Sequence, residues 1–170
     1  MHRSETLCKG VESGNVTPAD LFTPTSLVDG DLTLVLSESH GASPDHDDAP
    51  TYRFAMRHSE QGTHMGNLSV RAANTEYIVQ IFGHIGYGVR PLFRGHRYAA
   101  RACRLVLPVF AHHQIDPIWI TCNPDNISSR RTCELIGAHL INIVPVPEHT
   151  DLYLIGDRQK CRYRLSVDHS

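Results

Sequence analysis

The stretch Arg94-Gly95-His96-Arg97-Tyr98-Ala99 decides the fold expected for this chain. It stands between an apolar segment, residues 83–89, and a segment beginning near Arg97 in which apolar residues recur at helical spacing. In such a turn, the first N–H groups of the helix have no partners within the helix and lie at the positive end of its dipole. Gly95 lets a ligand approach the backbone closely, and Arg94 adds positive charge. The sequence therefore predicts a strand–turn–helix unit that either holds a pyrophosphate group or is an ordinary connection with solvated arginines.

A second strand–turn–helix unit follows downstream. Residues 117–122 are rich in β-branched and aromatic side chains, which predict a strand. Asn126 is a good N-cap residue, and Gly137 is typical of the residue at which a helix ends. Taken alone, this unit fits an ordinary structural connection as well as a binding site.

Together the two units resemble the GNAT superfamily of acyl-CoA-dependent N-acyltransferases. The first motif of that family is Arg/Gln-x-x-Gly-x-Gly/Ala after a strand ending in Val-x-Pro, and residues 89–99 follow it, with Arg97 where glycine is usual. The second signature is Asn-x-x-Ser/Ala followed by an arginine, a glutamate and a terminal glycine. It is matched here by Asn126, Ser129, Arg131, Glu134 and Gly137. The resemblance extends from Tyr52 to the C-terminus.

The resemblance implies an α/β (mixed α+β) fold, with a strongly twisted mixed sheet of about six or seven strands and helices on both faces. The pattern of the chain agrees with it, predicting four strands, a helix, a strand, a helix and two strands. Their expected ranges are 32–36, 52–57, 65–71 and 84–89, then 97 onward, 117–122, 127–136, 140–146 and 161–167. Pro108 is expected to kink or end the first helix. Residues 72–83 fit an extended segment or a short helix, and 147–160 a loop.

Two segments lie outside this pattern. Residues 1–30 predict an irregular N-terminal arm with a short helix near 19–22, so that 31–170 form a single acetyltransferase-like domain. Family members usually carry two helices between the first and second strands, whereas residues 37–50 here are a polar, acidic loop. Because those helices normally wall the acceptor site, the acceptor pocket cannot be inferred from relatives.

The resemblance also implies a site for acetyl-CoA, the expected co-substrate, in a cleft between the splayed strands 84–89 and 117–122. Backbone groups of Tyr87, Gly88 and Val89 would hold the pantetheine arm and polarise the acyl carbonyl. The pyrophosphate would bind the N–H groups of Arg94, Gly95, His96, Arg97, Tyr98 and Ala99. Asn126 and Ser129 would lie on the pantetheine side, and Arg131 would reach the nucleotide phosphates. A helix cap is the alternative interpretation of Asn126, and a solvated helix face that of Arg131.

Direct attack of a primary amine on the thioester requires a base for the amine and an acid for the leaving thiolate. His84 is the predicted base, since an unperturbed pKa near 6.5 suits neutral pH, and Glu76 is the alternative. A core histidine held by a neighbour is the competing interpretation of His84. Cys133 stands where many family members carry a tyrosine as the acid, and it fits either that role or a buried structural cysteine.

Composition limits the class of protein. The 170 residues are 41% hydrophobic and 20% charged, as in an ordinary one-domain globular protein. The formal charge of −2 gives no general attraction to nucleic acid or to an anionic membrane. The five cysteines include no Cys-x-x-Cys pair and the N-terminus has no apolar signal segment, which favours the cytoplasm. The 12 histidines are scattered, so no metal site is predicted.

The main prediction is therefore an acetyl-CoA-dependent N-acetyltransferase that acts on the primary amine of a small molecule or peptide. The alternative is a non-catalytic sensor or regulatory module of the same fold that binds acyl-CoA. Because many relatives pair through their sheets, a homodimer is a hypothesis by analogy.

Overall fold

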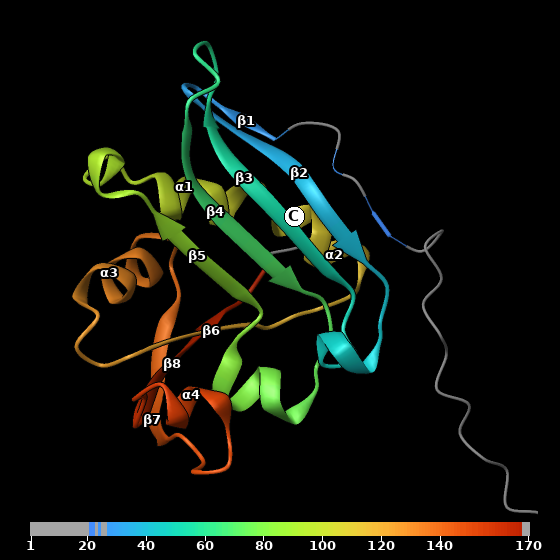
Figure 1. Cartoon of the computed structure of the whole chain (residues 1–170), viewed down its shortest axis with the longest axis vertical. Coiled ribbons are helices and arrows are strands. Elements are labelled where there is room, and N and C mark those ends of the chain that lie inside the picture. The colour runs from blue at the N-terminus through green and yellow to red at the C-terminus, as the bar shows by residue number, and fades with distance from the viewer. Residues whose placement is uncertain (1–20, 23, 25–26, 168–170) are drawn as a thin grey trace, which may run out of the picture.

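The computed structural model of the chain describes residues 21–22, 24 and 27–167 (Figure 1). The predicted N-terminal arm, including the start of the helix expected near residues 19–22, lies largely outside the described residues. None of the helices in the described part is long and apolar enough to cross a membrane.

The described strands form two antiparallel sheets, and the fold class is the expected one. Sheet A has the order β1-β2-β3-β4-β5, made of β1 (Val28–Asp29), β2 (Leu32–His40), β3 (Thr51–His58), β4 (His64–Arg71) and β5 (Ile85–Val89). Sheet B has the order β6-β8-β7, made of β6 (Ile118–Cys122), β7 (His139–Pro145) and β8 (Gln159–Leu165). The expected single mixed sheet is thus divided in two, and the division falls between β5 and β6.

The helices lie where the sequence pattern predicts them. The segment after β5 forms α1 (Tyr98–Leu105) and α2 (Leu107–His112), which are separated at Val106. Pro108 causes this break, because its ring and missing N–H prevent the helix from running through. After β6 comes α3 (Ile127–Leu135), followed by Gly137 at φ 87°.

Sheet A covers the core with one face only. On β3, Tyr52, Phe54 and Met56 are at most 1% exposed, whereas Arg53 and Arg57 point outward and are exposed. Helices α1 and α2 lie behind the sheet on the buried side (Figure 1). In the described residues no helix covers the outward face (Figure 1). As expected, the segment between β2 and β3 has no α-helix; it holds one 3-10 turn, Pro44–His46.

Three elements differ from the sequence expectations. Strand β2 continues to His40, because its polar end pairs with β3 past a bulge between Leu36 and Glu38. Strand β1 lies in the segment expected to be an irregular arm, where Val28 and Asp29 pair with β2. The segment before β5 contains a π-helical turn, Ile78–Phe82, in agreement with the short-helix alternative. The expected loop before β8 contains a one-turn helix, α4 (Asp151–Leu154), whose N-cap Thr150 accepts a hydrogen bond from the N–H of Tyr153. A single turn has too few residues to show a helical period, which is why the sequence pattern did not reveal it.

Candidate active site

Strands β5 and β6 are joined at one end and separate toward the other. The His84 N–H donates to the Trp119 carbonyl at 2.7 Å, and the Trp119 N–H donates to His84 Nδ1 at 2.8 Å. Beyond this contact no ladder joins the strands, which belong to different sheets. The expected splay is therefore present, with His84 and Trp119 at its closed end.

A groove of about 550 Å³ lies between β5, the turn before α1 and the first half of α3, and we call it the β5–α3 groove. It brings together all the predicted cofactor residues except His96. Those that line it are Tyr87, Gly88, Val89, Arg94, Gly95, Arg97, Tyr98, Ala99, Asn126, Ser129 and Arg131. His96 is exposed, and its ring centroid lies 5.6 Å from that of Tyr98. The two units recognised in the sequence thus meet at one groove.

The turn before α1 contains two residues in the left-handed backbone conformation. Gly95 has φ 89°, and Arg97, the N-cap of α1, has φ 60°. Both values lie in the left-handed region, which glycine adopts without strain and other residues rarely adopt. A Cβ on Gly95 would meet nothing within 4 Å, so its conformation, and not lack of space, is what requires glycine there. The Arg94 Nε donates to the Val89 carbonyl at 3.1 Å and ties the turn to the end of β5.

Helix α3 begins at the opposite wall of the groove. The Asn126 side-chain oxygen accepts a hydrogen bond from the Ser129 N–H at 3.1 Å, so the predicted helix cap is confirmed. Arg131 is 70% exposed and pairs with Glu134 at 3.3 Å, as expected for neighbours on a solvated helix face. It also lines the groove, and its guanidinium can leave this weak pair for a ligand.

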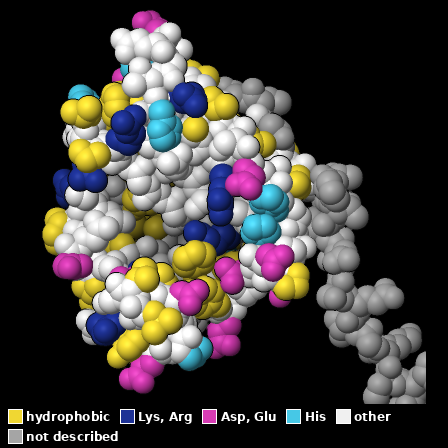
Figure 2. Space-filling model, viewed as in Figure 1, with side chains coloured by type: hydrophobic (Ala, Val, Ile, Leu, Met, Phe, Trp, Pro, Cys, Tyr) yellow, Lys and Arg dark blue, Asp and Glu magenta, His cyan; other side chains and the backbone are white. Residues whose placement is uncertain are grey.

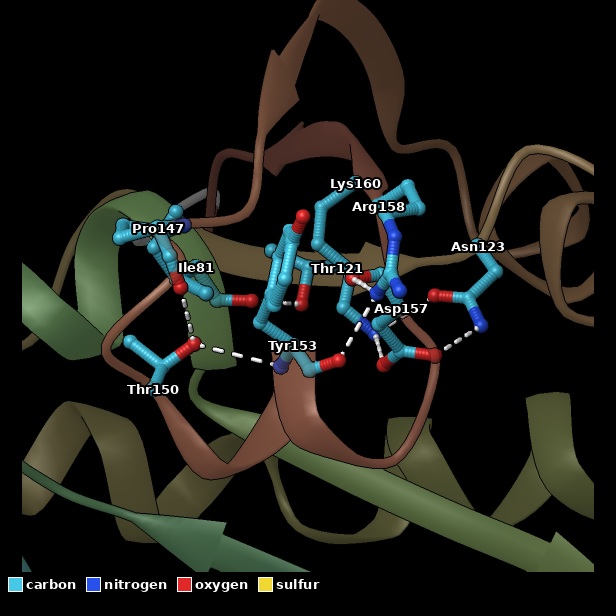
Figure 3. A network of polar contacts seen from close by, with 9 residues as sticks. All are labelled: Ile81, Thr121, Asn123, Pro147, Thr150, Tyr153, Asp157, Arg158 and Lys160. Atoms are coloured by element: carbon cyan, nitrogen blue, oxygen red, sulfur yellow. Dashed lines mark hydrogen bonds and ion pairs between the residues drawn. The ribbon is translucent and has the colours of Figure 1, made fainter.

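A network of polar side chains anchors the start of the turn between β6 and α3 (Figure 3). The Lys160 ammonium donates to Asn123 Oδ1 and to Asp157 Oδ2, both at 2.7 Å, and Asn123 Nδ2 donates to Asp157 Oδ1 at 2.6 Å. Asn123 directly follows β6, so the closed triangle fixes the start of the turn to β8 and to the loop after α4. Asp157 and Lys160 carry no signal in the sequence, because nothing in the linear pattern pairs them with Asn123.

Tyr87 reaches across the groove to α3. Its hydroxyl lies 2.8 Å from Ser129 Oγ, 3.2 Å from the Ser129 carbonyl and 3.8 Å from the Cys133 sulfur. Cys133 is fully buried behind this hydroxyl, and a hydrogen bond with Cys122, together with burial, raises the pKa of the Cys133 thiol. Burial raises the pKa of Tyr87 well above its usual value. The role expected for Tyr87 from the sequence involved only its backbone, because the motif carries no signal for a contact between its hydroxyl and α3.

The two residues proposed as bases lie outside the groove. His84 is 0% exposed; its Nδ1 accepts from Trp119, and its Nε2 lies 3.1 Å from both the Ala73 carbonyl and Asn74 Oδ1. Burial lowers the pKa of His84 to about 4. His84 is therefore a core histidine that joins β5 to β6, and the base hypothesis for it is not supported. Glu76 is exposed, just before the π-helical turn, and does not line the groove.

A second hollow, also of about 550 Å³, lies on the outward face of sheet A, and we call it the outer hollow. Figure 2 looks onto this face and shows it hollowed in the middle, with basic side chains beside the depression. Tyr87 and Gly88 line both the outer hollow and the β5–α3 groove. The two therefore meet at these residues of β5. No group of three or more potential metal ligands occurs in the described residues.

Comparisons with known proteins agree with this architecture. A family model described as an acetyltransferase (GNAT) domain matches residues 27–139. In the comparison with curated proteins, nothing matches.

Solved structures of low sequence identity share the fold. An acetyltransferase (GNAT family) from Bacillus anthracis is 19% identical, with a TM-score of 0.53, over 67% of this chain and 65% of that one. A ribosomal-protein-S5-alanine acetyltransferase from Vibrio fischeri is 16% identical, with a TM-score of 0.56, over 70% of this chain and 63% of that one. The microcin C7 self-immunity acetyltransferase MccE, solved with acetyl-CoA and AMP, is 16% identical, with a TM-score of 0.51, over 69% and 61%. The chain thus spans less than two thirds of the length of each.

Proposed function

This chain belongs to the GNAT acetyltransferase family, and from that premise we propose that it transfers an acetyl group from acetyl-CoA to a primary amine. One observation carries the proposal. The β5–α3 groove joins the N–H groups of the Gly95 turn to the Asn126 cap and ends at Tyr87 and Gly88, where the outer hollow begins. A cofactor and an acceptor entering from different sides would meet there.

The cofactor fits the groove by charge and by hydrogen bonding. The turn at Gly95 offers backbone donors, and Arg94 and Arg97 offer positive charge, to the pyrophosphate. The pantetheine arm runs between β5 and the Asn126–Ser129 turn, and Arg131 takes the nucleotide phosphates. MccE, which shares the fold, is described in complex with acetyl-CoA, and this supports the assignment.

The chemistry is a direct attack. The amine nitrogen forms a bond to the acyl carbon while the bond from that carbon to sulfur breaks, and the proton lost by the amine leaves to solvent through the outer hollow. Backbone groups at Tyr87 and Gly88 orient and polarise the carbonyl. The departing thiolate takes a proton from the Tyr87 hydroxyl, which regains one from solvent, because Tyr87 lines the groove whereas Cys133 is buried behind its hydroxyl.

We also propose that the chain forms a homodimer through β7. This strand is at the edge of sheet B, and it exposes Leu140, Ile141 and Ile143 by 42%, 51% and 46%. An edge strand with apolar side chains and free backbone groups can pair with a second copy of itself. The described cysteines are all unbonded, which supports a reducing compartment such as the cytoplasm.

Isothermal titration with acetyl-CoA tests the function, comparing the native protein with Gly95→Asp, which places a carboxylate against the pyrophosphate. Gly62→Asp is the matched control, because Gly62 also has positive φ and open space but lies in the hairpin between β3 and β4. Binding by the native protein and by Gly62→Asp, lost in Gly95→Asp, is the expected result. A screen of amines for thiol release then separates an enzyme from a non-catalytic acyl-CoA-binding module. No binding by the native protein would refute the proposed function.

A further inference from the structure

The floor of the outer hollow is a row of residues paired across four strands. Glu38 on β2 pairs with Arg53 on β3, Arg53 with Ser69 on β4, and Ser69 with Gly86 on β5. Because Gly86 lacks a side chain, nothing projects from it into the hollow at the β5 end of the row. The row therefore runs from charged side chains at the far end to small polar groups beside the proposed point of transfer.

The carboxylate at the far end of this row, that of Glu38, already has partners among its neighbours. Glu38 lies 3.3 Å from the Arg53 guanidinium and 2.6 Å from His40, and the His40 hydrogen bond lowers the pKa of Glu38. The carboxylate of Glu38 is thus already shared by two partners. Of the described residues that line the outer hollow or the β5–α3 groove, Glu38 is the one that carries a carboxylate.

Arg71 does not line the hollow itself, but its guanidinium lies against Ser69 and Gly86, which form the β5 end of the floor, and it has no ion-pair partner in the described part of the chain. In the described residues no carboxylate lies within ion-pair distance of its guanidinium, which donates to the Gly83 carbonyl at 3.2 Å and to Ser69 Oγ at 3.4 Å. The guanidinium also stacks on the Phe82 ring, 3.7 Å from its centroid. Burial lowers the pKa of Arg71 to about 10, which leaves it charged at neutral pH. Asp47 is the carboxylate that acts on this guanidinium, and it does so from beyond ion-pair distance. A partly buried cation with no anion in contact can take one from a ligand.

The position of Arg71 relates this charge to the reacting groups. A Cβ placed on Gly86 would lie 3.3 Å from Arg71 Nη2 and 3.0 Å from Ser69 Oγ, so the guanidinium reaches over Gly86. Gly88, which lines both hollows, is two residues further along β5, about 7 Å in an extended strand. An anionic group a few bonds from the attacking nitrogen spans that distance.

We propose that the acceptor is a primary amine carrying a carboxylate a few bonds from its nitrogen, and that Arg71 binds this carboxylate at the β5 end of the outer hollow. Ser69 and Asn67 add polar contacts along the floor. The proposal rests on the proposed function and names its substrate class. Both a free amino acid and a peptide with an acidic first residue carry this chemistry.

Matched pairs of acceptors test the proposal by thiol release from acetyl-CoA. Glycine, β-alanine and 4-aminobutyrate are compared with their primary amides, and the peptide amide Asp-Ala-Ala with Asn-Ala-Ala. We expect at least a roughly tenfold higher kcat/KM for the carboxylate member of one pair, as for a charge-assisted contact. A preference in the amino-acid pairs identifies a free amino acid, and a preference in the peptide pair alone identifies a peptide N-terminus.

Variants then assign the preference to Arg71. Arg71→Gln should lower kcat/KM for the carboxylates at least about tenfold more than for the amides and so abolish the preference. Arg71→Lys should keep part of it. Arg57→Gln is the control, because Arg57 is on the outward side of the same strand as Arg53 but outside both hollows. If Arg71→Gln does not fold, Gly86→Ala gives a second test, since its methyl group displaces Ser69 Oγ and the Arg71 guanidinium.

Two results would overturn the proposal. One is equal kcat/KM for carboxylates and amides in the native protein, and the other is a preference that persists in folded Arg71→Gln. Titration with acetyl-CoA keeps this failure distinct from failure of the function itself. Binding of acetyl-CoA with equal use of amides refutes the carboxylate site alone, whereas absence of acetyl-CoA binding refutes the function and this proposal with it.

Discussion

The hydroxyl of Tyr87 lies 2.8 Å from Ser129 Oγ, and this contact joins β5 to α3 across the β5–α3 groove. The two residues come from the two units that the sequence analysis recognised separately. Behind them lies the Cys133 sulfur, 3.8 Å from the same hydroxyl. A phenol supplied by the strand thus stands beside the helix position that carries a tyrosine in many members of the family.

Tyr87→Phe should lower kcat by roughly a hundredfold, the size of effect typical of a lost general acid. The affinity for acetyl-CoA should change little, because the ring that packs against the groove is kept. Because burial raises the pKa of Tyr87, its phenol should stay protonated up to about pH 10. Ionisation of Tyr87 should therefore not lower kcat of the native protein between pH 8 and about pH 10. Steady-state kinetics with titration of acetyl-CoA measures both quantities.

Tyr163→Phe is the control for that experiment. Tyr163 is also buried, at 1% exposure, and its hydroxyl also has a partner, Arg130 Nε at 3.2 Å, but it does not line the groove. The control should lose some stability and keep kcat. An unchanged kcat in Tyr87→Phe would instead rule out Tyr87 as the proton donor.

Two substitutions at Arg97 separate the effect of its backbone conformation from the effect of its side chain. Its φ of 60° costs a non-glycine residue about 1–2 kcal/mol, part of which glycine loses again through its freedom in the unfolded chain. Arg97→Gly should therefore raise the free energy of unfolding by up to about 1 kcal/mol, whereas Arg97→Ala should not. Urea denaturation of both variants measures the difference.

The same two variants show whether the Arg97 side chain binds phosphate. Both lack the guanidinium, so both should bind acetyl-CoA more weakly by a similar factor, roughly three- to tenfold for one phosphate contact near solvent. Equal affinity of Arg97→Ala and the native protein would show that the backbone of the turn acts alone. A loss in Arg97→Gly only would mean that the turn itself has changed.

Local signals in the sequence were sufficient for most of the fold. The break at Pro108, the cap at Asn126 and the stop at Gly137 each follow from the chemistry of one residue, and the structure confirms all three. The alternation on β3 likewise predicted its two faces. The end of β2 was placed too early, because the polar residues after Leu36 are held by pairing with β3, a contact between distant parts of the chain.

The candidate site was predicted less completely, for the same physical reason. A motif specifies backbone donors near itself, so the Gly95 turn and the Asn126 cap were found. The base prediction for His84 rests on the pKa of an unperturbed histidine, whereas its hydrogen bonds with Trp119 and Asn74 are tertiary contacts that the sequence does not show. Arg71 shows the converse, because nothing in its own segment indicates that it reaches over Gly86.

Ile143→Lys should convert a dimer into a monomer if β7 is the interface. The Ile143 side chain is 46% exposed in the single chain, and a lysine there would meet the lysine of a second copy in a symmetric pairing. Val35→Lys is the control, since Val35 is 43% exposed but lies on sheet A. Analytical ultracentrifugation at several concentrations measures the change. A native protein that is monomeric at all of them would refute the β7 interface.

Asp157→Asn should destabilise the protein in a pH-dependent way. Burial opposes the charge of Asp157, but the hydrogen bonds from Lys160 and Asn123 outweigh it and lower the pKa of this carboxyl (Figure 3). A lowered pKa in the folded state contributes stability that is fully present above the unfolded value of about 4 and is lost as the pH falls through the folded value. At pH 7, Asp157→Asn should therefore lower the free energy of unfolding by roughly 1–3 kcal/mol, because Lys160 keeps its charge in a mostly buried position.

The difference between Asp157→Asn and the native protein should shrink as the pH falls below about 4, the unfolded value, and should vanish once the pH has passed below the lowered folded value. Urea denaturation at several pH values follows this convergence. Asp45→Asn serves as the control, because Asp45 is exposed in the turn between β2 and β3 and has no ion pair in the described residues, so its curve should run parallel to that of the native protein. A constant difference at all pH values would show that Asp157 acts through its shape and hydrogen bonds alone, and not through its charge.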